Sequence, residues 1–278
     1  MIVVTGATGQ LGRHVVEGLR KQGVKFAAGA RNTAADLGDV EVRELDYNRP
    51  ETIAPALQGA EKVLLISGSE VGQRVAQHTA VVEAAKQAGV RHIIYTSAPH
   101  ADTSPLVLAP EHKATEEAIL ASGLPYTFLR NGWYHENYVE TFKLGAQHGE
   151  IVGAAGDGRV ASASRKDFAD AAVAVLTQPG HENKVYELTG DVAWTFPELA
   201  EEIGKAADRP VTYRDLSVEE LQQHLVGVGM PPEVAGFVAA IDGDIASGLL
   251  GHTPGELRAL IGRPTTPVSV AIEDVLKG

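Results

Sequence analysis

The sequence has no cysteine, and its acidic residues outnumber its basic ones. The missing thiols exclude disulfides, thiolate zinc sites and cysteine nucleophiles. The 24 Lys and Arg against 36 Asp and Glu give a formal net charge of −12, and no run of basic residues occurs. Proteins that bind nucleic acid usually carry a basic face that offsets the phosphate charge. We therefore expect no nucleic-acid partner.

Long hydrophobic runs are also missing. Apolar stretches such as residues 62–66 are much shorter than the roughly 20 residues that a membrane helix needs. An apolar strand begins at residue 2, which leaves no room for a cleaved targeting signal. These absences predict a cytoplasmic protein without a membrane partner, and the lack of cysteine fits a reducing compartment.

Familiar catalytic patterns are absent as well. None of the seven tyrosines is followed four residues later by lysine. In a Tyr-x-x-x-Lys pair the lysine lowers the tyrosine pKa, so that the tyrosine can move the proton of an alcohol or a ketone. There is no Gly-x-Ser-x-Gly nucleophile elbow, and the ten histidines show no metal-ligand spacing. We predict neither hydrolysis nor a metal site.

Apolar strand patterns alternate with helix patterns from residue 2 to residue 130. Short buried strands separated by helices predict parallel pairing in a sheet that helices cover on both faces. The expected strands are residues 2–5, 24–30, 40–45, 63–66, 92–96 and 126–129, and the expected helices are 10–22, 72–88 and 111–121. The fold class is therefore α/β, a Rossmann-type doubly wound parallel sheet whose ligand lies beyond the carboxyl ends of the strands.

Helix-start signals dominate after residue 130. Three stretches, beginning at Thr195, Ser217 and Thr253, have the S/T-x-x-E spacing of a capping box. They predict a smaller, mostly helical C-terminal substrate lobe, with further strands near 185–188, in the main sheet, and 211–213. We assign residues 1–130 to the Rossmann domain, to which 160–189 return, and residues 131–159 and 190–278 to the substrate-binding lobe.

A glycine-rich loop joins the first strand to the first helix. Gly6 permits a sharp turn, Gly9 lets the backbone approach a pyrophosphate, and Gly12 lets the helix pack on the strand. The phosphates would then face free N–H groups at the helix N-terminus. The loop predicts a dinucleotide site, and the alternative is a glycine turn that serves packing alone. Its candidate cofactor-binding residues are Gly6, Ala7, Thr8, Gly9, Gln10, Leu11 and Gly12.

Residues at the ends of the next strands bear on the choice of cofactor. Arg31 follows the second strand, where an NAD enzyme tends to have an acidic residue, and its guanidinium can pair with a 2′-phosphate. This favours NADP(H) over NAD(H), and the alternative is a solvated surface arginine. Asp46, after the third strand, is a candidate for the adenine amino group or a turn residue. The fourth strand is followed by Ser67, Gly68 and Ser69. We expect this segment to lie against the cofactor, and the alternative is a plain loop.

A site that places a nicotinamide beside its substrate but has no strong general acid can reduce only some classes of acceptor. Quinones and cationic dyes take electrons readily, and water can supply protons, whereas ketones need the missing acid. Trp133 and Tyr134 follow the sixth strand, where planar rings either stack on a flat acceptor or pack in the core. Tyr134 and Asn137 are the candidate catalytic residues, as hydrogen-bond donors to the developing quinol oxygen.

These motifs together resemble the atypical short-chain dehydrogenases related to NmrA, and within them the type 2 NAD(P)H:quinone oxidoreductases and the triphenylmethane reductases. The matching stretches cover nearly the whole chain: residues 2–12 (IVVTGATGQLG), 64–73 (LLISGSEVGQ), 100–106 (HADTSPL), 129–138 (LRNGWYHENY), 153–164 (GAAGDGRVASAS) and 184–194 (KVYELTGDVAW). The resemblance implies flavin-free reduction of quinones by NADPH. It also implies that residues 131–137, with Trp133, border the nicotinamide and that Arg165 lies near the cofactor. The segment between Arg31 and Val40 is shorter than that pattern, which leaves the adenine contacts open.

Two classes of function fit the sequence. The first is an oxidoreductase that transfers hydride from NADPH to a quinone, or to another acceptor such as a triphenylmethane dye. The second is a redox sensor of the NmrA type, which binds NADP(H) and contacts another protein without turnover. The cleft-facing aromatic residues favour the enzyme. Its expected partner is a small-molecule quinone or similar acceptor, and a homodimer is left open.

Overall fold

A parallel sheet of seven strands forms one half of the chain, in the order β3-β2-β1-β4-β5-β6-β9. The computed structural model describes all 278 residues, Met1 to Gly278. The strands are β1 (Ile2–Val4), β2 (Phe26–Ala30), β3 (Glu41–Glu44), β4 (Lys62–Leu65), β5 (His92–Ser97), β6 (Tyr126–Asn131) and β9 (Lys184–Leu188). This order confirms the predicted doubly wound parallel sheet, and the first six strands lie within two residues of their predicted bounds.

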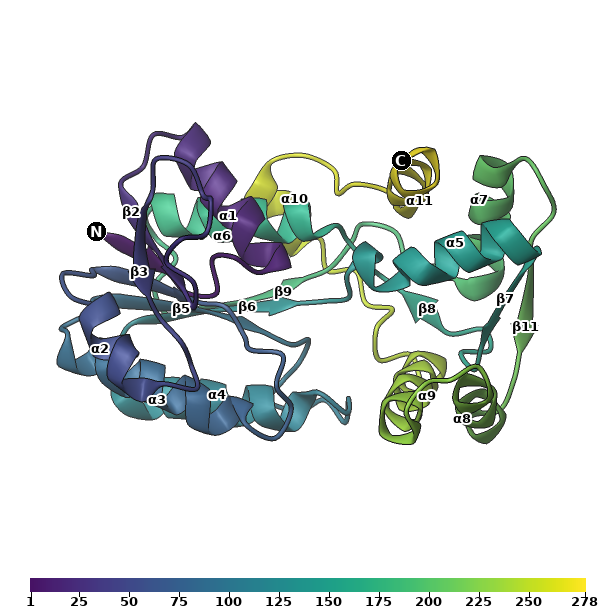
Figure 1. Cartoon of the computed structure of the whole chain (residues 1–278), viewed down its shortest axis with the longest axis horizontal. Helices are drawn as coiled ribbons and strands as arrows, with labels where there is room; N and C mark the ends of the chain where they lie inside the picture. Colours follow the sequence, from purple (N-terminus) through teal and green to yellow (C-terminus); the bar gives the residue numbers. More distant parts are fainter.

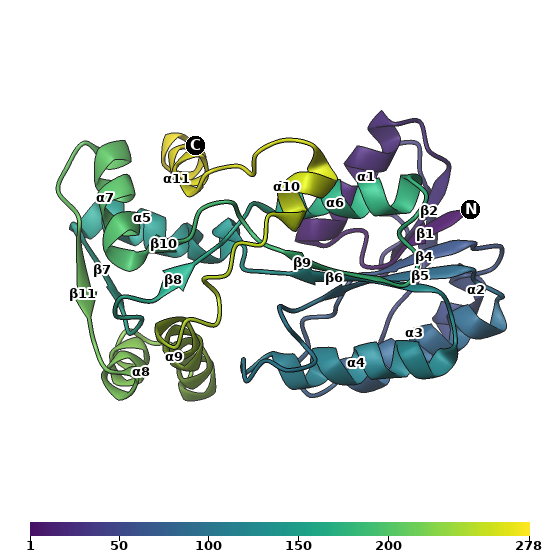
Figure 2. The same ribbon diagram turned by 180° about the vertical axis from the view of Figure 1, so that it is seen from behind.

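Helices cover both faces of the sheet (Figures 1 and 2). On one face lie α1 (Gln10–Lys21), α6 (Arg165–Thr177) and α10 (Glu256–Ile261). On the other face lie α2 (Ile53–Ala56), preceded by a 3-10 turn (Pro50–Thr52), α3 (Arg74–Gln87) and α4 (Ala109–Ser122). The central strands β1, β4, β5 and β6 are buried along almost their whole length because helices cover both of their faces.

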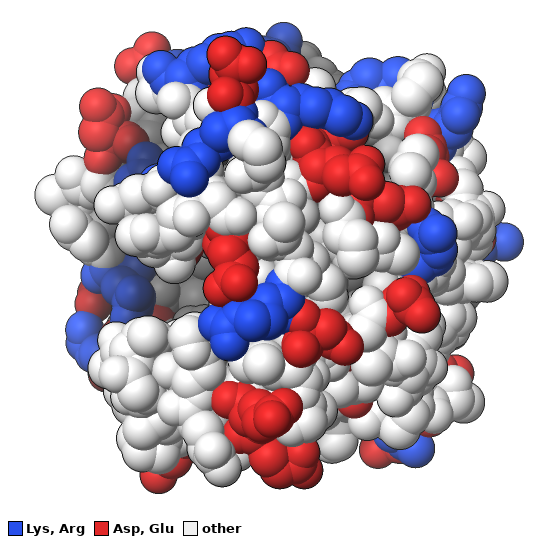
Figure 3. Space-filling model, turned by 90° about the vertical axis from the view of Figure 1, so that its right-hand side faces the viewer, with Lys and Arg blue, Asp and Glu red and all other residues white.

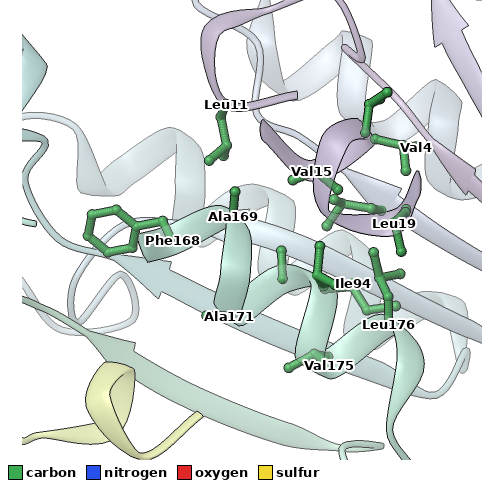
Figure 4. Close-up of a cluster of buried hydrophobic side chains, with 14 of the residues drawn as sticks. Val4, Leu11, Val15, Leu19, Ile94, Phe168, Ala169, Ala171, Val175 and Leu176 are labelled. Carbon is green, nitrogen blue, oxygen red and sulfur yellow. The ribbon is translucent and has the colours of Figure 1, made fainter. Parts of the chain in front are cut away.

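The contact between α1 and α6 makes the core of the first face (Figure 4). Val15 and Leu19 of α1 are fully buried there, at the spacing of one helical turn. A Cβ on Gly18 of α1 would lie 2.9 Å from Cγ2 of Val173, so small residues let the two helices approach closely. This packing fixes the start of α1 beside the carboxyl ends of the strands.

The second half of the molecule is a lobe of helices around two short strand pairs. Strand β7 (Glu150–Gly153) pairs in parallel with β11 (Thr212–Asp215), and β8 (Arg159–Val160) pairs antiparallel with β10 (Trp194–Thr195). The helices are α5 (Val139–His148), preceded by a 3-10 turn (His135–Tyr138), α7 (Phe196–Ala207), α8 (Val218–Gly227), α9 (Pro232–Ala246) and α11 (Val268–Lys277). No helix in the structure combines the length and the apolar composition that crossing a membrane requires.

Two of the three predicted capping boxes are confirmed. Thr195 accepts a hydrogen bond from the backbone of Glu198, whose carboxylate accepts one from the backbone of Thr195. Ser217 and Glu220 make the same reciprocal pair at the start of α8. Each pair satisfies two N–H groups that would otherwise lack an acceptor at the helix start.

The capping box predicted at Thr253 is wrong. Helix α10 begins after Gly255, which has φ +80, and no side chain caps it. The carboxylate of Glu256 instead accepts a hydrogen bond from the backbone N–H of Glu187 in β9, at 2.5 Å. Leu257 is buried in the core shared with α6. The predicted lobe 190–278 therefore includes one helix that packs on the Rossmann half.

Acidic and basic side chains are interspersed on the end of the molecule that the lobe forms (Figure 3). No continuous basic surface covers this face. This distribution agrees with the low share of Lys and Arg in the sequence.

A buried carboxyl group, Asp242, joins α9 to β7. Its Oδ2 accepts a hydrogen bond of 2.8 Å from the backbone N–H of Ala154. Burial, opposed by this bond and reinforced by the charge of Asp215, raises the pKa of Asp242 to about 6. The folded protein therefore holds this proton more tightly than the unfolded chain does.

The stability of the wild-type protein should fall as the pH rises from about 4 to about 6, because the folded state must then release a proton that it prefers to keep. Asp242→Asn retains an acceptor for Ala154 and removes the titration. Relative to wild type, its free energy of unfolding should increase between pH 4 and pH 7 by up to about 3 kcal/mol. Urea unfolding at several pH values measures this, with the exposed Asp157→Asn as control. A pH-independent difference between Asp242→Asn and wild type would contradict the prediction.

Candidate functional site

The glycine loop between β1 and α1 has the geometry of a phosphate cradle. Gly6 has φ +58, a conformation that side chains disfavour. A Cβ on Gly12 would lie 2.2 Å from the carbonyl oxygen of Gly6, so only glycine fits there. Gly9 precedes the first turn of α1, and no side chain caps this helix. The N–H groups of its first turn are left for a ligand, which an anion would satisfy.

Arg31 lies directly after β2 and is exposed. It forms no ion pair and no side-chain hydrogen bond within the chain. Its guanidinium is therefore available to a phosphate in the place that the sequence predicts.

Asp46 has a local role in the structure. Its Oδ1 accepts a hydrogen bond of 3.0 Å from the backbone N–H of Asn48, and its own N–H donates to Oγ1 of Thr52. Asp46 therefore acts as a turn residue, one of the two roles that the sequence predicts for it. Its Oδ2 has no partner in the turn. A contact from Asp46 to adenine stays a prediction.

The Ser67–Ser69 segment is held against the sheet by side chains from two elements. The N–H of Ser67 donates to Oγ1 of Thr96 in β5, at 2.9 Å. The N–H of Gly68 donates to Nε2 of His78 in α3, at 3.0 Å, and the carbonyl of Gly68 accepts from Nε of Arg74, at 2.9 Å. The loop is therefore built into the carboxyl edge of the sheet, and its contact with a cofactor stays a prediction.

His78 was not singled out by the sequence and acts as a fixed support. Because Nε2 accepts from Gly68, Nδ1 carries the proton and donates to Oγ1 of Thr115, at 3.0 Å. Burial and the neighbouring charge of Arg74 lower the pKa of His78 to about 3, so the ring stays neutral. No local pattern in the sequence marks this residue, because its partners come from other elements.

The structure brings three predicted residues together after β6. The Arg165 guanidinium lies 4.7 Å from the ring centroid of Tyr134, and its Nη2 donates to Oδ1 of Asn137, at 3.2 Å. Glu136 accepts from the backbone N–H of Arg165, at 2.9 Å, which joins this loop to the start of α6. Burial raises the pKa of Tyr134, so its hydroxyl stays protonated and accepts from Nδ2 of Asn131, at 3.3 Å.

The two rings that follow β6 do not form one aromatic wall. Tyr134 packs against Phe168 of α6, with ring centroids 5.1 Å apart. Trp133 packs on the core of the C-terminal lobe instead. Both rings are half-buried, so each keeps an accessible side.

A buried arginine organises the carboxyl ends of β5, β6 and β9. Arg130 donates from Nε and Nη2 to the two oxygens of Glu116 in α4, at 3.0 and 2.7 Å. Its Nη1 donates to Asp102, at 2.8 Å, and to Glu187, at 3.0 Å. Ser97 donates to Glu116, at 2.6 Å. The loop after β5 is thereby fixed over the end of the sheet.

A small crevice, called the interlobe crevice below, separates this edge from the C-terminal lobe. Its volume of about 10 Å³ suits a single water-sized group. Its lining residues are Pro99, His100, Gly132, Glu187, Thr189, Leu249, Leu250 and His252. An open groove of about 680 Å³, the lobe groove, runs between the 155–159 and 246–251 segments and shares His252 with the crevice.

Gly12→Ala should weaken NADPH binding by at least about 10-fold, because its methyl group displaces the Gly6 carbonyl and opens the cradle. Gly227→Ala is the matched control, since a Cβ there meets nothing within 4 Å. Fluorescence titration gives the dissociation constants, and thermal melting shows that both variants fold. Equal affinity of the two variants would show that the close approach at Gly12 does not shape the site.

Comparison with known proteins agrees with this geometry. The family described as NAD(P)H-binding matches residues 6–179. Quinone oxidoreductase 2 of Escherichia coli (strain K12) is 48% identical over 278 residues, which cover 98% of this chain and 97% of the relative.

Two solved structures extend the comparison. NADPH-dependent quinone oxidoreductase from Escherichia coli, complexed with NADPH, has a TM-score of 0.96 at 47% identity, covering 99% of this chain and 100% of that one. The Citrobacter sp. triphenylmethane reductase complexed with NADP(H) has a TM-score of 0.94 at 41% identity, with coverage of 99% and 100%. The family resemblance is thereby confirmed: the chain belongs to the NAD(P)H-binding, NmrA-like proteins.

Proposed function

We propose that this protein is an NADPH-dependent quinone reductase that works without a flavin. The observation that carries the proposal is the 48% identity with quinone oxidoreductase 2 along nearly the whole of both chains. The alternative of a sensor without turnover rests on the more distant NmrA structure, whose 19% identity supports the fold alone.

The residues of the carboxyl edge fit the cofactor. The Gly6–Gly12 loop and the start of α1 would hold the pyrophosphate, and Arg31 would pair with the 2′-phosphate. Oδ1 of Asn131, at the end of β6, is buried and has no hydrogen-bond partner, so it suits an amide donor such as that of the nicotinamide. When bound, the reduced nicotinamide supplies a hydride to the acceptor.

The chain's own groups would position the acceptor and limit water. Tyr134 offers a protonated hydroxyl, and Asn137 and Arg165 form the polar rim beside it. Because the Tyr-x-x-x-Lys dyad is missing, the acceptor must be one that hydride reduces easily, which favours quinones over ketones.

A second acceptor class is also supported. The triphenylmethane reductase of Citrobacter sp. shares the fold at 41% identity, and a triphenylmethane dye cation takes hydride without any proton. We further propose that the protein acts in the cytoplasm, in keeping with its lack of cysteine.

Arg31→Asp should weaken NADPH binding by about 100-fold and NADH binding by less than about 3-fold, because the new carboxylate repels only the 2′-phosphate. Lys25→Asp, at an exposed lysine before β2 that makes no ion pair or side-chain hydrogen bond, is the control for the change of charge. Fluorescence titration with each nucleotide measures the ratio. Equal losses for both nucleotides would mean that Arg31 does not contact the 2′-phosphate.

The function is tested by following NADPH absorbance with purified protein, with and without a benzoquinone, alongside an NADH control and a blank without protein. We expect loss of NADPH that requires quinone, prefers NADPH over NADH and occurs in protein with no flavin absorbance. Tight NADPH binding without turnover on quinones or dyes would replace the reductase with the sensor.

A further inference from the structure

We propose that the interlobe crevice receives an oxygen of the acceptor and that His100 donates the proton this oxygen takes up. The inference rests on the proposed function and names a catalytic residue for it. It is carried by the conformation of His100, by an unpartnered hydroxyl in the same crevice and by the groove that adjoins it.

His100 is held in a conformation that the rest of the site imposes. Its φ of +46 lies in the left-handed region, which is uncommon for a residue with a side chain and is often found at functional sites. Its backbone N–H donates to Oε2 of Glu187, at 3.1 Å, and its ring Nδ1 lies 3.3 Å from Oε1 of the same carboxylate. Glu187 is itself fixed by Arg130.

This arrangement prepares the ring for proton transfer. The carboxylate beside Nδ1 orients the ring, which leaves Nε2–H of the imidazolium to donate to another group. The side chain of His100 is partly exposed, so water can return the proton after each turnover.

A second residue that lines the crevice has a polar atom without a partner. Thr189, directly after β9, is 7% exposed, and its Oγ1 makes no hydrogen bond. A buried hydroxyl without a partner is costly, and an oxygen in the crevice would satisfy it. Leu249 and Leu250 contribute apolar surface to the same lining. The crevice has room for about one such atom.

The lobe groove provides space for the rest of the acceptor. It shares His252 with the crevice, and the His252 ring lies 5.6 Å from that of His100. Pro99 and Gly132, which follow β5 and β6, put the crevice at the carboxyl edge of the sheet, where the ligands of doubly wound folds bind. A flat ring of the quinone class would thus have its oxygen in the crevice and its body toward the groove.

The step is balanced by groups already named. Reduction of a quinone to a hydroquinone takes one hydride, which the bound nicotinamide would provide, and one proton. The C–H bond that supplies the hydride breaks, the hydride forms an O–H bond at the quinone oxygen outside the crevice, and both carbon–oxygen π bonds are lost as the ring becomes aromatic. The oxygen in the crevice forms its O–H bond with the proton of the His100 imidazolium, whose Nε2–H bond breaks. The neutral imidazole then takes a proton from water.

The loop does not depend on the His100 side chain for its position. Asp102 is bound by Arg130, and the backbone N–H of Val107 donates to Asp244 of α9, at 3.0 Å. His100→Gln should therefore fold, and its backbone bond to Glu187 is retained.

The experiment compares His100→Gln and Thr189→Val with His148→Gln, an exposed histidine at the end of α5. With NADPH and 1,4-naphthoquinone, His100→Gln should lower kcat by about 100-fold and leave the dissociation constant of NADPH within about 2-fold. The kcat of the wild-type protein should depend on pH, and this dependence should be lost in His100→Gln. Thr189→Val should raise KM for the quinone by about 10-fold with little change in kcat. Calorimetry with hydroquinone and no turnover should show weaker binding by both variants.

The outcomes distinguish a failure of the His100 assignment from a failure of the proposed reductase function. If His100→Gln matches His148→Gln in kcat and in pH profile, the assignment of His100 is overturned while the reductase stands. If the wild-type protein binds NADPH but reduces no quinone, the proposed function fails, and this inference fails with it. If His100→Gln melts early, His100→Asn and Thr189→Val carry the same test, and unchanged hydroquinone binding by Thr189→Val overturns the crevice as the site.

Discussion

The buried guanidinium of Arg130 is the interaction on which the rest of the site depends. It binds three carboxylates that come from α4, from the loop after β5 and from β9. Charges this deep cost free energy to remove from water, and deleting one partner of such a group typically costs about 3–5 kcal/mol. In return, the bidentate guanidinium fixes the positions of the carboxylates that it binds. The end of the sheet thereby becomes a rigid platform.

The same platform joins the two halves of the molecule. The chain crosses between them several times, and the loop after β5 reaches Asp244 of the lobe while α10 returns from the lobe to β9. The glycine cradle lies toward one side of the carboxyl edge and the interlobe crevice toward the lobe. A dinucleotide along this edge and an acceptor between the halves would meet there, as in other doubly wound folds.

The sequence predicts best what depends on neighbouring residues. The glycine spacing, the short apolar strands and the capping boxes at Thr195 and Ser217 are local patterns, and the structure contains each of them. Thr253 has the same spacing but no capping box, because the carboxylate of Glu256 instead accepts a hydrogen bond from the backbone N–H of Glu187 in β9. The pattern alone does not reveal that competing partner.

The features that sequence reasoning missed depend on residues far apart in the chain. His100 and Glu187 are 87 positions apart, and Arg130 meets Asp102 and Glu116 only because parallel strands end at one edge. Trp133 and Tyr134 are adjacent in sequence, yet their rings pack on different cores. No periodicity reports such pairings, so the crevice becomes visible only in three dimensions.

The central claim is direct hydride transfer, with NADPH and acceptor bound together in one site and no carrier between them. Initial rates measured over a matrix of NADPH and quinone concentrations test this most directly. The account predicts reciprocal plots that intersect, because both substrates must be bound before either product leaves. Parallel lines would show that the protein is reduced first and reoxidised later, and they would contradict the account.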